Sequence, residues 1–116
     1  MAFPQNIDGL LTEAEKHELY SKLVQQLNKD FHLANIAIDF PNDIEPDQLK
    51  IGLHETVFKL IQEKFADYLN LLYIIDVSEK QVRALEGDDM VALAEAVSFL
   101  ILKREWQKVW FKARYS

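Results

Sequence analysis

Apolar residues recur at intervals of three and four along most of this chain, the spacing that places side chains on one face of an α-helix. Three such stretches are visible, at residues 12–31, 46–75 and 90–113. Only three glycines and three prolines occur among the 116 residues, so the tight turns of a β-rich fold lack the residues they need. The sequence therefore predicts an all-α, bundle-like single helical domain over residues 1–116, with three long helices and one short helix.

Capping residues predict where the first two long helices begin. Thr12 and Glu15 match a capping box, in which each side chain can bond the backbone amide of the other residue. The first helix is therefore expected to begin at Thr12. Pro46 suits the first position of the second long helix, because its missing amide hydrogen has no helical partner there.

The same reasoning predicts the short helix and the last helix. Ser78 begins a second capping box, and Gly87 is well placed to end the short helix in a left-handed conformation. Asp88 or Asp89 is expected to cap the last helix, which starts near Met90.

One extended segment, around residues 34–44, interrupts the helical pattern. Ile36, Ile38 and Phe40 alternate with smaller or polar residues, as in a half-buried strand. A single strand has nothing to pair with in a monomer. Either the segment lies against the helices, which we favour, or two copies pair across a dimer.

Lys64 falls in the middle of the apolar stripe of the second long helix, beside Phe65. A buried lysine with a lowered pKa can act as a base. More often such a side chain reaches solvent or pairs with a neighbour such as Asp67. We favour this structural interpretation.

Motifs that would carry chemistry are missing. The absence of cysteine removes thiol nucleophiles and thiolate metal sites, and none of the three histidines has a glutamate three residues before it, as a di-iron bundle requires. The isolated glycines cannot build a phosphate-binding loop. The acids between Asp39 and Asp47 lack the glycine and terminal glutamate of a calcium loop. We therefore predict no catalytic residue, no cofactor, no metal and no small-molecule ligand.

The last 14 residues reverse the charge of the chain. They hold five basic residues and one acid, whereas the whole chain has 13 basic and 19 acidic residues and a net charge of −6. Arg104, Lys108 and Lys112 recur every four residues, and Phe111 and Tyr115 lie near them on the same helical face. Large apolar side chains on a charged face usually mark a contact. The alternative, of equal weight, is that Phe111 and Tyr115 fold back on the chain's own core. These five residues are the candidate interaction surface.

The leading hypothesis is a non-enzymatic, cytoplasmic interaction module that self-associates as a homodimer through its C-terminal helix, with residues 36–40 as a further contact. A cytoplasmic location is expected because the chain begins without a signal-peptide pattern and has no apolar run of about 20 residues. One alternative is a basic, aromatic helix that binds nucleic acid or an anionic membrane, which the net negative charge disfavours. A second is an acidic inhibitor of a basic protein, and a third is an enzyme that uses Lys64, His54 or Glu55 between helices.

Overall fold

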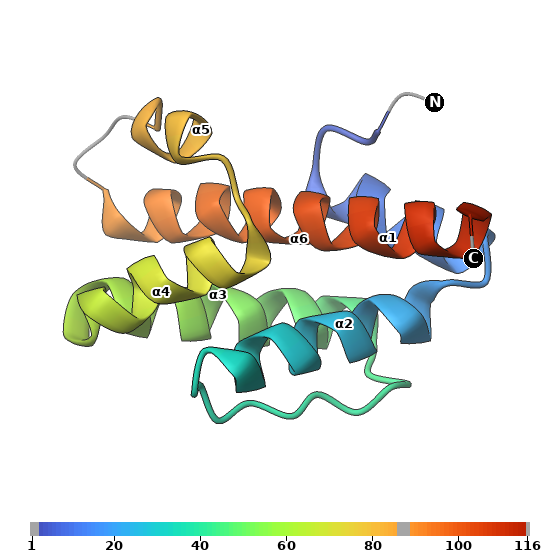
Figure 1. Cartoon of the computed structure of the whole chain (residues 1–116), viewed down its shortest axis with the longest axis horizontal. Helices are drawn as coiled ribbons and strands as arrows, with labels where there is room; N and C mark the ends of the chain where they lie inside the picture. Colours follow the sequence, from blue (N-terminus) through green and yellow to red (C-terminus); the bar gives the residue numbers. More distant parts are fainter. Residues whose placement is uncertain (1–2, 86–88, 116) are drawn as a thin grey trace.

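A computed structural model describes residues 3–85 and 89–115 of the chain. Within these residues lie six α-helices and no strand. They are α1 (Ile7–Lys16), α2 (Tyr20–Leu33), α3 (Pro46–Glu63), α4 (Phe65–Ile75), α5 (Glu79–Arg83) and α6 (Met90–Tyr115). The long helix α6 spans the molecule, and α1, α2, α3 and α4 all pack against it (Figure 1). The all-α class predicted from the apolar stripes is confirmed.

The first predicted helix is in fact two helices, and its predicted start at Thr12 is wrong. Asn6 caps α1 instead, because its side-chain oxygen accepts a hydrogen bond from the Gly9 amide at 2.7 Å. Thr12 lies inside α1 and donates its hydroxyl to the carbonyl of Asp8 at 2.9 Å. The chain then turns at Glu18, whose φ of 58° is left-handed, before α2 begins. The overlooked signal is a short stripe of buried residues, Ile7, Leu10, Leu11 and Ala14.

Residues 34–45, called the strap below, form the extended segment that the sequence predicts. The strap runs antiparallel to α2, because later residues of α2 bond earlier residues of the strap. Asn28 makes two of these bonds, donating to the Phe40 carbonyl at 2.8 Å and accepting from the Phe40 amide at 2.9 Å. The other two join Tyr20 to the Ile44 carbonyl at 2.6 Å and His32 to the Ile38 carbonyl.

The strap also packs against the core through its apolar side chains. Ile36, Ile38 and Phe40 are partly buried against it. Gly52 on α3 leaves room for the Phe40 ring, since a Cβ at that position would lie 2.8 Å from the ring. The favoured interpretation, in which the segment lies against the helices, is confirmed.

The second predicted long helix begins at Pro46 as expected but is broken at Lys64. Lys64 has φ −141° and ψ 62° and is exposed, so its predicted position inside the apolar stripe is wrong. In an unbroken helix it would lie one turn from both Leu60 and Tyr68, which are buried. Ending α3 at this residue leaves the ammonium group in water and avoids the free-energy cost of burying a charge.

The predicted caps of α5 and α6 are present where the structure describes them. The Ser78 hydroxyl accepts a hydrogen bond from a first-turn amide of α5 at 3.2 Å. Asp89 caps α6, and its carboxylate accepts from the Val91 amide at 2.9 Å. The predicted roles of Gly87 and Asp88 lie outside the described residues.

The core lies around the middle of α6. Trp106 is its largest fully buried side chain, and Leu102 and Val109 flank it along α6. The helix then leaves the core, because residues 111–115 are exposed. The core thus fixes the orientation of α6, and with it the directions of the charged side chains at residues 104–108.

Candidate functional site

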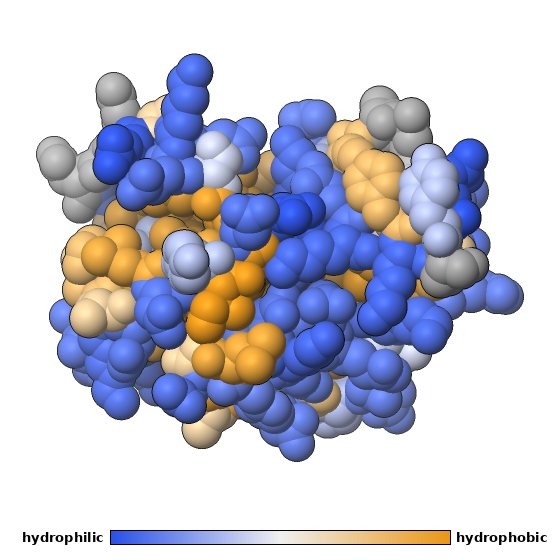
Figure 2. Space-filling model, viewed as in Figure 1, coloured by the Kyte–Doolittle hydropathy of each residue, from blue (hydrophilic) through white to orange (hydrophobic). Residues whose placement is uncertain are grey.

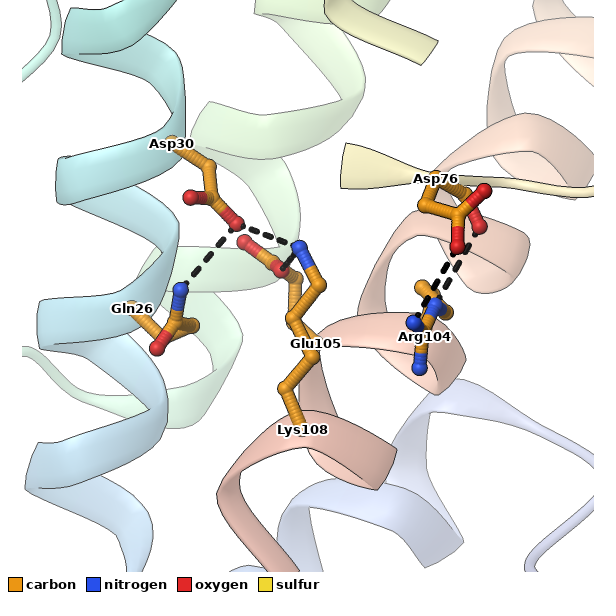
Figure 3. A network of polar contacts seen from close by, with 6 residues as sticks. All are labelled: Gln26, Asp30, Asp76, Arg104, Glu105 and Lys108. Atoms are coloured by element: carbon orange, nitrogen blue, oxygen red, sulfur yellow. Dashed lines mark hydrogen bonds and ion pairs between the residues drawn. The ribbon is translucent and has the colours of Figure 1, made fainter. Parts of the chain in front are cut away.

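Arg104 and Lys108, two of the five residues of the candidate interaction surface, are engaged inside the molecule. Arg104 donates to the Asp76 carbonyl at 3.2 Å and to the Asp76 carboxylate at 3.3 Å. Lys108 donates to the Asp30 carboxylate at 2.9 Å and lies 3.3 Å from a carboxyl oxygen of Glu105 (Figure 3). The regular spacing of basic residues therefore does not produce a free basic ridge.

Phe111, Lys112 and Tyr115, the other three residues of that surface, are exposed at the end of α6. Phe111 is 48% exposed and Tyr115 is 75% exposed. Their rings stack on each other, with centroids 6.0 Å apart and an interplanar angle of 15°. A contact at these three residues stays a prediction.

Lys108 joins two buried carboxyl groups, Asp30 from α2 and Glu105 from α6, whose side chains are 6% and 0% exposed (Figure 3). Burial, together with the adjacent Asp30 carboxylate, raises the pKa of Glu105 to about 9, and Lys108 opposes this only in part. Lys108, at 3.3 Å from one carboxyl oxygen, compensates the burial of an ionised Glu105 only in part, whereas the protonated form can donate a hydrogen bond to Asp30.

The pKa of Asp30 moves the other way. Burial disfavours its charge, but hydrogen bonds from Glu105, Lys108 and Gln26 outweigh burial and hold the pKa below its ordinary value. At neutral pH the pair therefore keeps one proton, on Glu105, and one negative charge, on Asp30, which Lys108 balances.

A stripe of exposed side chains on α4 is a surface feature that the sequence analysis missed. Phe65, Leu69 and Tyr73 follow one another at four-residue intervals and are 54%, 51% and 83% exposed. The opposite face of α4 supplies Tyr68, Leu71, Leu72 and Ile75 to the core. Apolar surface accordingly gathers over α4 and the beginning of α6 (Figure 2).

Phe65 belongs to the apolar stripe that the sequence predicts for one long helix over residues 46–75, but it does not face the core, and the break at Lys64 explains why. That expectation assumed one straight helix, in which Phe65 continues the buried stripe of α3. The break starts a new helix with its own buried face and leaves Phe65 on the outside. The signal in the sequence is that α4 has large apolar residues on both faces, more than one buried face requires.

The residues considered for catalysis do not form a reactive cluster within the described part of the chain. Two further polar groups, the hydroxyls of Thr56 and Ser98, are already engaged, because they donate to backbone carbonyls one turn earlier at 2.8 Å and 2.7 Å. His54 and Glu55 line a groove of about 210 Å³ between α3 and α6, mostly with apolar neighbours. Burial lowers the pKa of His54. Lys64 is not among the residues that line this groove.

His17 makes two side-chain contacts, one with Glu13 and one with Trp110. Its Nε2 lies 3.0 Å from the Glu13 carboxylate, and its ring meets Trp110 edge-on with centroids 4.9 Å apart.

Across residues 3–85 and 89–115, no three histidine, aspartate or glutamate side chains are grouped to hold a metal ion. None of the helices described there has both the length and the apolar character needed to cross a membrane.

No protein-family model, no curated protein and no solved structure matches this chain.

Proposed function

We propose that the protein is a non-catalytic helical interaction module that forms a homodimer, and that the apolar stripe of α4 is its main contact. The observation that carries this proposal is the exposure of Phe65, Leu69 and Tyr73 on a helix whose other face already serves the core. Monomeric proteins rarely leave large contiguous apolar patches in water, and such patches usually mark an interaction site.

The sequence of the stripe fits a second copy of the same chain. It reads aromatic, leucine, aromatic, so it is symmetric about Leu69. A two-fold contact requires a self-complementary surface, and two antiparallel α4 helices crossing at Leu69 would bring Phe65 of one copy against Tyr73 of the other. Edge-to-face or offset aromatic pairs of this kind add to the free energy of burial.

Charges at the two ends of α4 support the same orientation. Lys64 precedes the stripe and makes no ion pair within the described residues, while Asp76 follows α4 and keeps its side chain 80% exposed beside Arg104. In an antiparallel pair, Lys64 of each copy comes near Asp76 of the other. A parallel pair would instead bring like charges together, which disfavours that arrangement.

The C-terminal helix remains a second candidate contact. Phe111, Lys112 and Tyr115 are exposed, but the internal ion pairs of Arg104 and Lys108 leave this surface less basic than the sequence indicates. These internal ion pairs also weaken the alternative of nucleic-acid or membrane binding, because such binding depends on basic side chains that are free to meet phosphate groups.

Sedimentation of the purified protein tests the proposal. At about 100 μM, where weak association is detectable, the expected mass is twice the 13.5 kDa of one chain. Leu69→Asp should weaken association by about 30-fold or more, because it places a charge at the centre of the contact. Ile51→Asp is the matched control: Ile51 is 50% exposed on α3, away from the stripe, so this variant should dimerise normally.

Two outcomes would overturn the proposal. A monomer at all concentrations would remove self-association itself. A dimer that survives Leu69→Asp but is lost in Phe111→Ser would move the contact to the C-terminal helix, as the sequence analysis predicts.

A further inference from the structure

A groove between α2 and α6 gathers lysines in a chain that is otherwise acidic. Its volume is about 290 Å³, and Lys22 and Lys29 from α2 line it together with Lys112 from α6. The groove also contains glutamine side chains, and Val109 forms part of its apolar floor. No aspartate or glutamate lines it, although acids outnumber basic residues by 19 to 13 in the whole chain.

The three ammonium groups are not neutralised by the described part of the molecule. None of Lys22, Lys29 and Lys112 forms an ion pair with a carboxylate among those residues, in contrast to Lys108 one turn away from Lys112. Asp30 follows Lys29 on α2, but Lys108 and the Gln26 amide already satisfy its charge. The groove is therefore a local centre of positive charge.

We infer that this groove binds a small anion carrying a diphosphate group, either inorganic or attached to a small organic body. This assignment is independent of the proposed dimer, because α4 contributes no lining residue, and it departs from the sequence analysis, which predicts no small-molecule ligand.

The donors in the groove suit the oxygens of a phosphate group. No arginine lines the groove, so a planar carboxylate would not meet the two parallel hydrogen bonds that an arginine fork makes. Lysine is a common ligand of phosphate, because its ammonium group acts as a point charge that phosphate oxygens can approach from several directions. The Gln25 amide and the second amide hydrogen of Gln26 supply further donors.

Size and charge favour a small ligand over a nucleic acid. A volume near 290 Å³ lies just below the range for ligand pockets, about 300–1,000 Å³. The net charge of −6 repels an extended polyanion over the rest of the surface, whereas a compact anion meets only the three lysines.

Calorimetric titration with pyrophosphate at low ionic strength tests the inference, with ADP and citrate as parallel probes. Pyrophosphate should bind, and in NMR spectra of the protein it should shift the backbone amide resonances of residues 22–29 and 109–113. Tighter binding of ADP would indicate that the groove also contacts the organic part of the ligand. Equal binding of ADP and pyrophosphate would indicate that it contacts the diphosphate group alone. Both results support the diphosphate site. Citrate binding as tightly as pyrophosphate, or an oligonucleotide binding more tightly, would overturn the assignment.

Two triple variants separate the groove from general charge. Replacing Lys22, Lys29 and Lys112 by glutamine should weaken pyrophosphate binding by about tenfold or more. Replacing Lys16, Lys59 and Lys80 by glutamine changes the net charge equally at exposed sites outside the groove, and binding should stay within about twofold. All six side chains are exposed, so circular dichroism should show both variants folded. Equal losses in the two variants, or no binding of pyrophosphate at millimolar concentration, would refute the site.

Discussion

Two ion pairs lie one turn apart on α6 and share their chemistry but not their surroundings (Figure 3). Arg104 meets Asp76 at 3.3 Å, and the two side chains are 32% and 80% exposed. Lys108 meets Asp30 at 2.9 Å, where the carboxylate is 6% exposed, and it also approaches the fully buried Glu105. The same four-residue spacing of basic side chains thus produces one surface contact and one buried network.

The comparison teaches that contact with water decides how much an ion pair contributes to the free energy of unfolding. Water and salt screen the outer pair, so breaking it removes little free energy. In the inner network the two carboxyl groups are buried and only Lys108 reaches water, so removing one member leaves a buried group without its partner. Three substitutions test this difference, in order of decreasing expected effect.

Asp30→Asn should have the largest effect. It keeps the shape of the side chain but removes the charge that Lys108 balances, so the free energy of unfolding at pH 7 should fall by about 3 kcal/mol. Urea denaturation measures this value. A loss below about 1 kcal/mol would mean that Lys108 simply turns to solvent and that the network contributes no more than the outer pair.

Glu105→Gln should have an effect that depends on pH. The pKa of Glu105 is about 9 in the folded protein and near 4.5 in the unfolded chain, so the folded state binds the extra proton between these values. Its contribution to stability is complete below pH 4.5 and is lost as pH rises towards 9, by up to about 1.4 kcal/mol per pH unit.

Glutamine imitates the protonated acid and does not titrate. The variant should match the natural protein near pH 5 and should exceed its free energy of unfolding by a margin that widens with every pH unit up to pH 8. Denaturation curves at several pH values provide the measurement. Parallel pH profiles for the two proteins would show that Glu105 is not protonated in the fold.

Asp76→Asn should have the smallest effect and is the matched control for Asp30→Asn. Asparagine tolerates the left-handed φ of 70° at this position, and Arg104 keeps its bond to the backbone carbonyl. The expected loss is about 0.5 kcal/mol or less, and it should disappear at high salt. A loss comparable to that of Asp30→Asn would abolish the distinction between the two pairs.

Local signals in the sequence predict much of the fold. Pro46, Ser78 and Asp89 act at the helix ends where their side-chain chemistry places them, and the stripe of α2 is buried as its spacing indicates. The breaks at Glu18 and Lys64 are not predicted, because neither residue is a helix breaker by itself. Each break depends on which side chains the assembled core can accept.

Neither of the two surfaces on which the proposals rest was predicted, and the reason is the same for both. The α4 stripe is visible only once Lys64 ends α3, and the lysine groove requires α2 and α6 to be adjacent. The buried acids did leave a signal, since Asp30 lies next to the buried Phe31 and Glu105 lies between Leu102 and Val109 on the core side of α6. An acid at a core position of each of two helices indicates a shared proton or a shared cation.

The strap carries a sequence that alternates like a β-strand, yet α2 holds its backbone through the side chains of Tyr20, Asn28 and His32. Asn28 matters most, because its amide meets both the donor and the acceptor of Phe40, as a neighbouring strand would. An open strand edge is a template for fibril growth. In this protein the side chains of α2 already bond the backbone of the strap, so another chain cannot pair with those groups. We therefore expect resistance to aggregation to depend on α2 remaining folded.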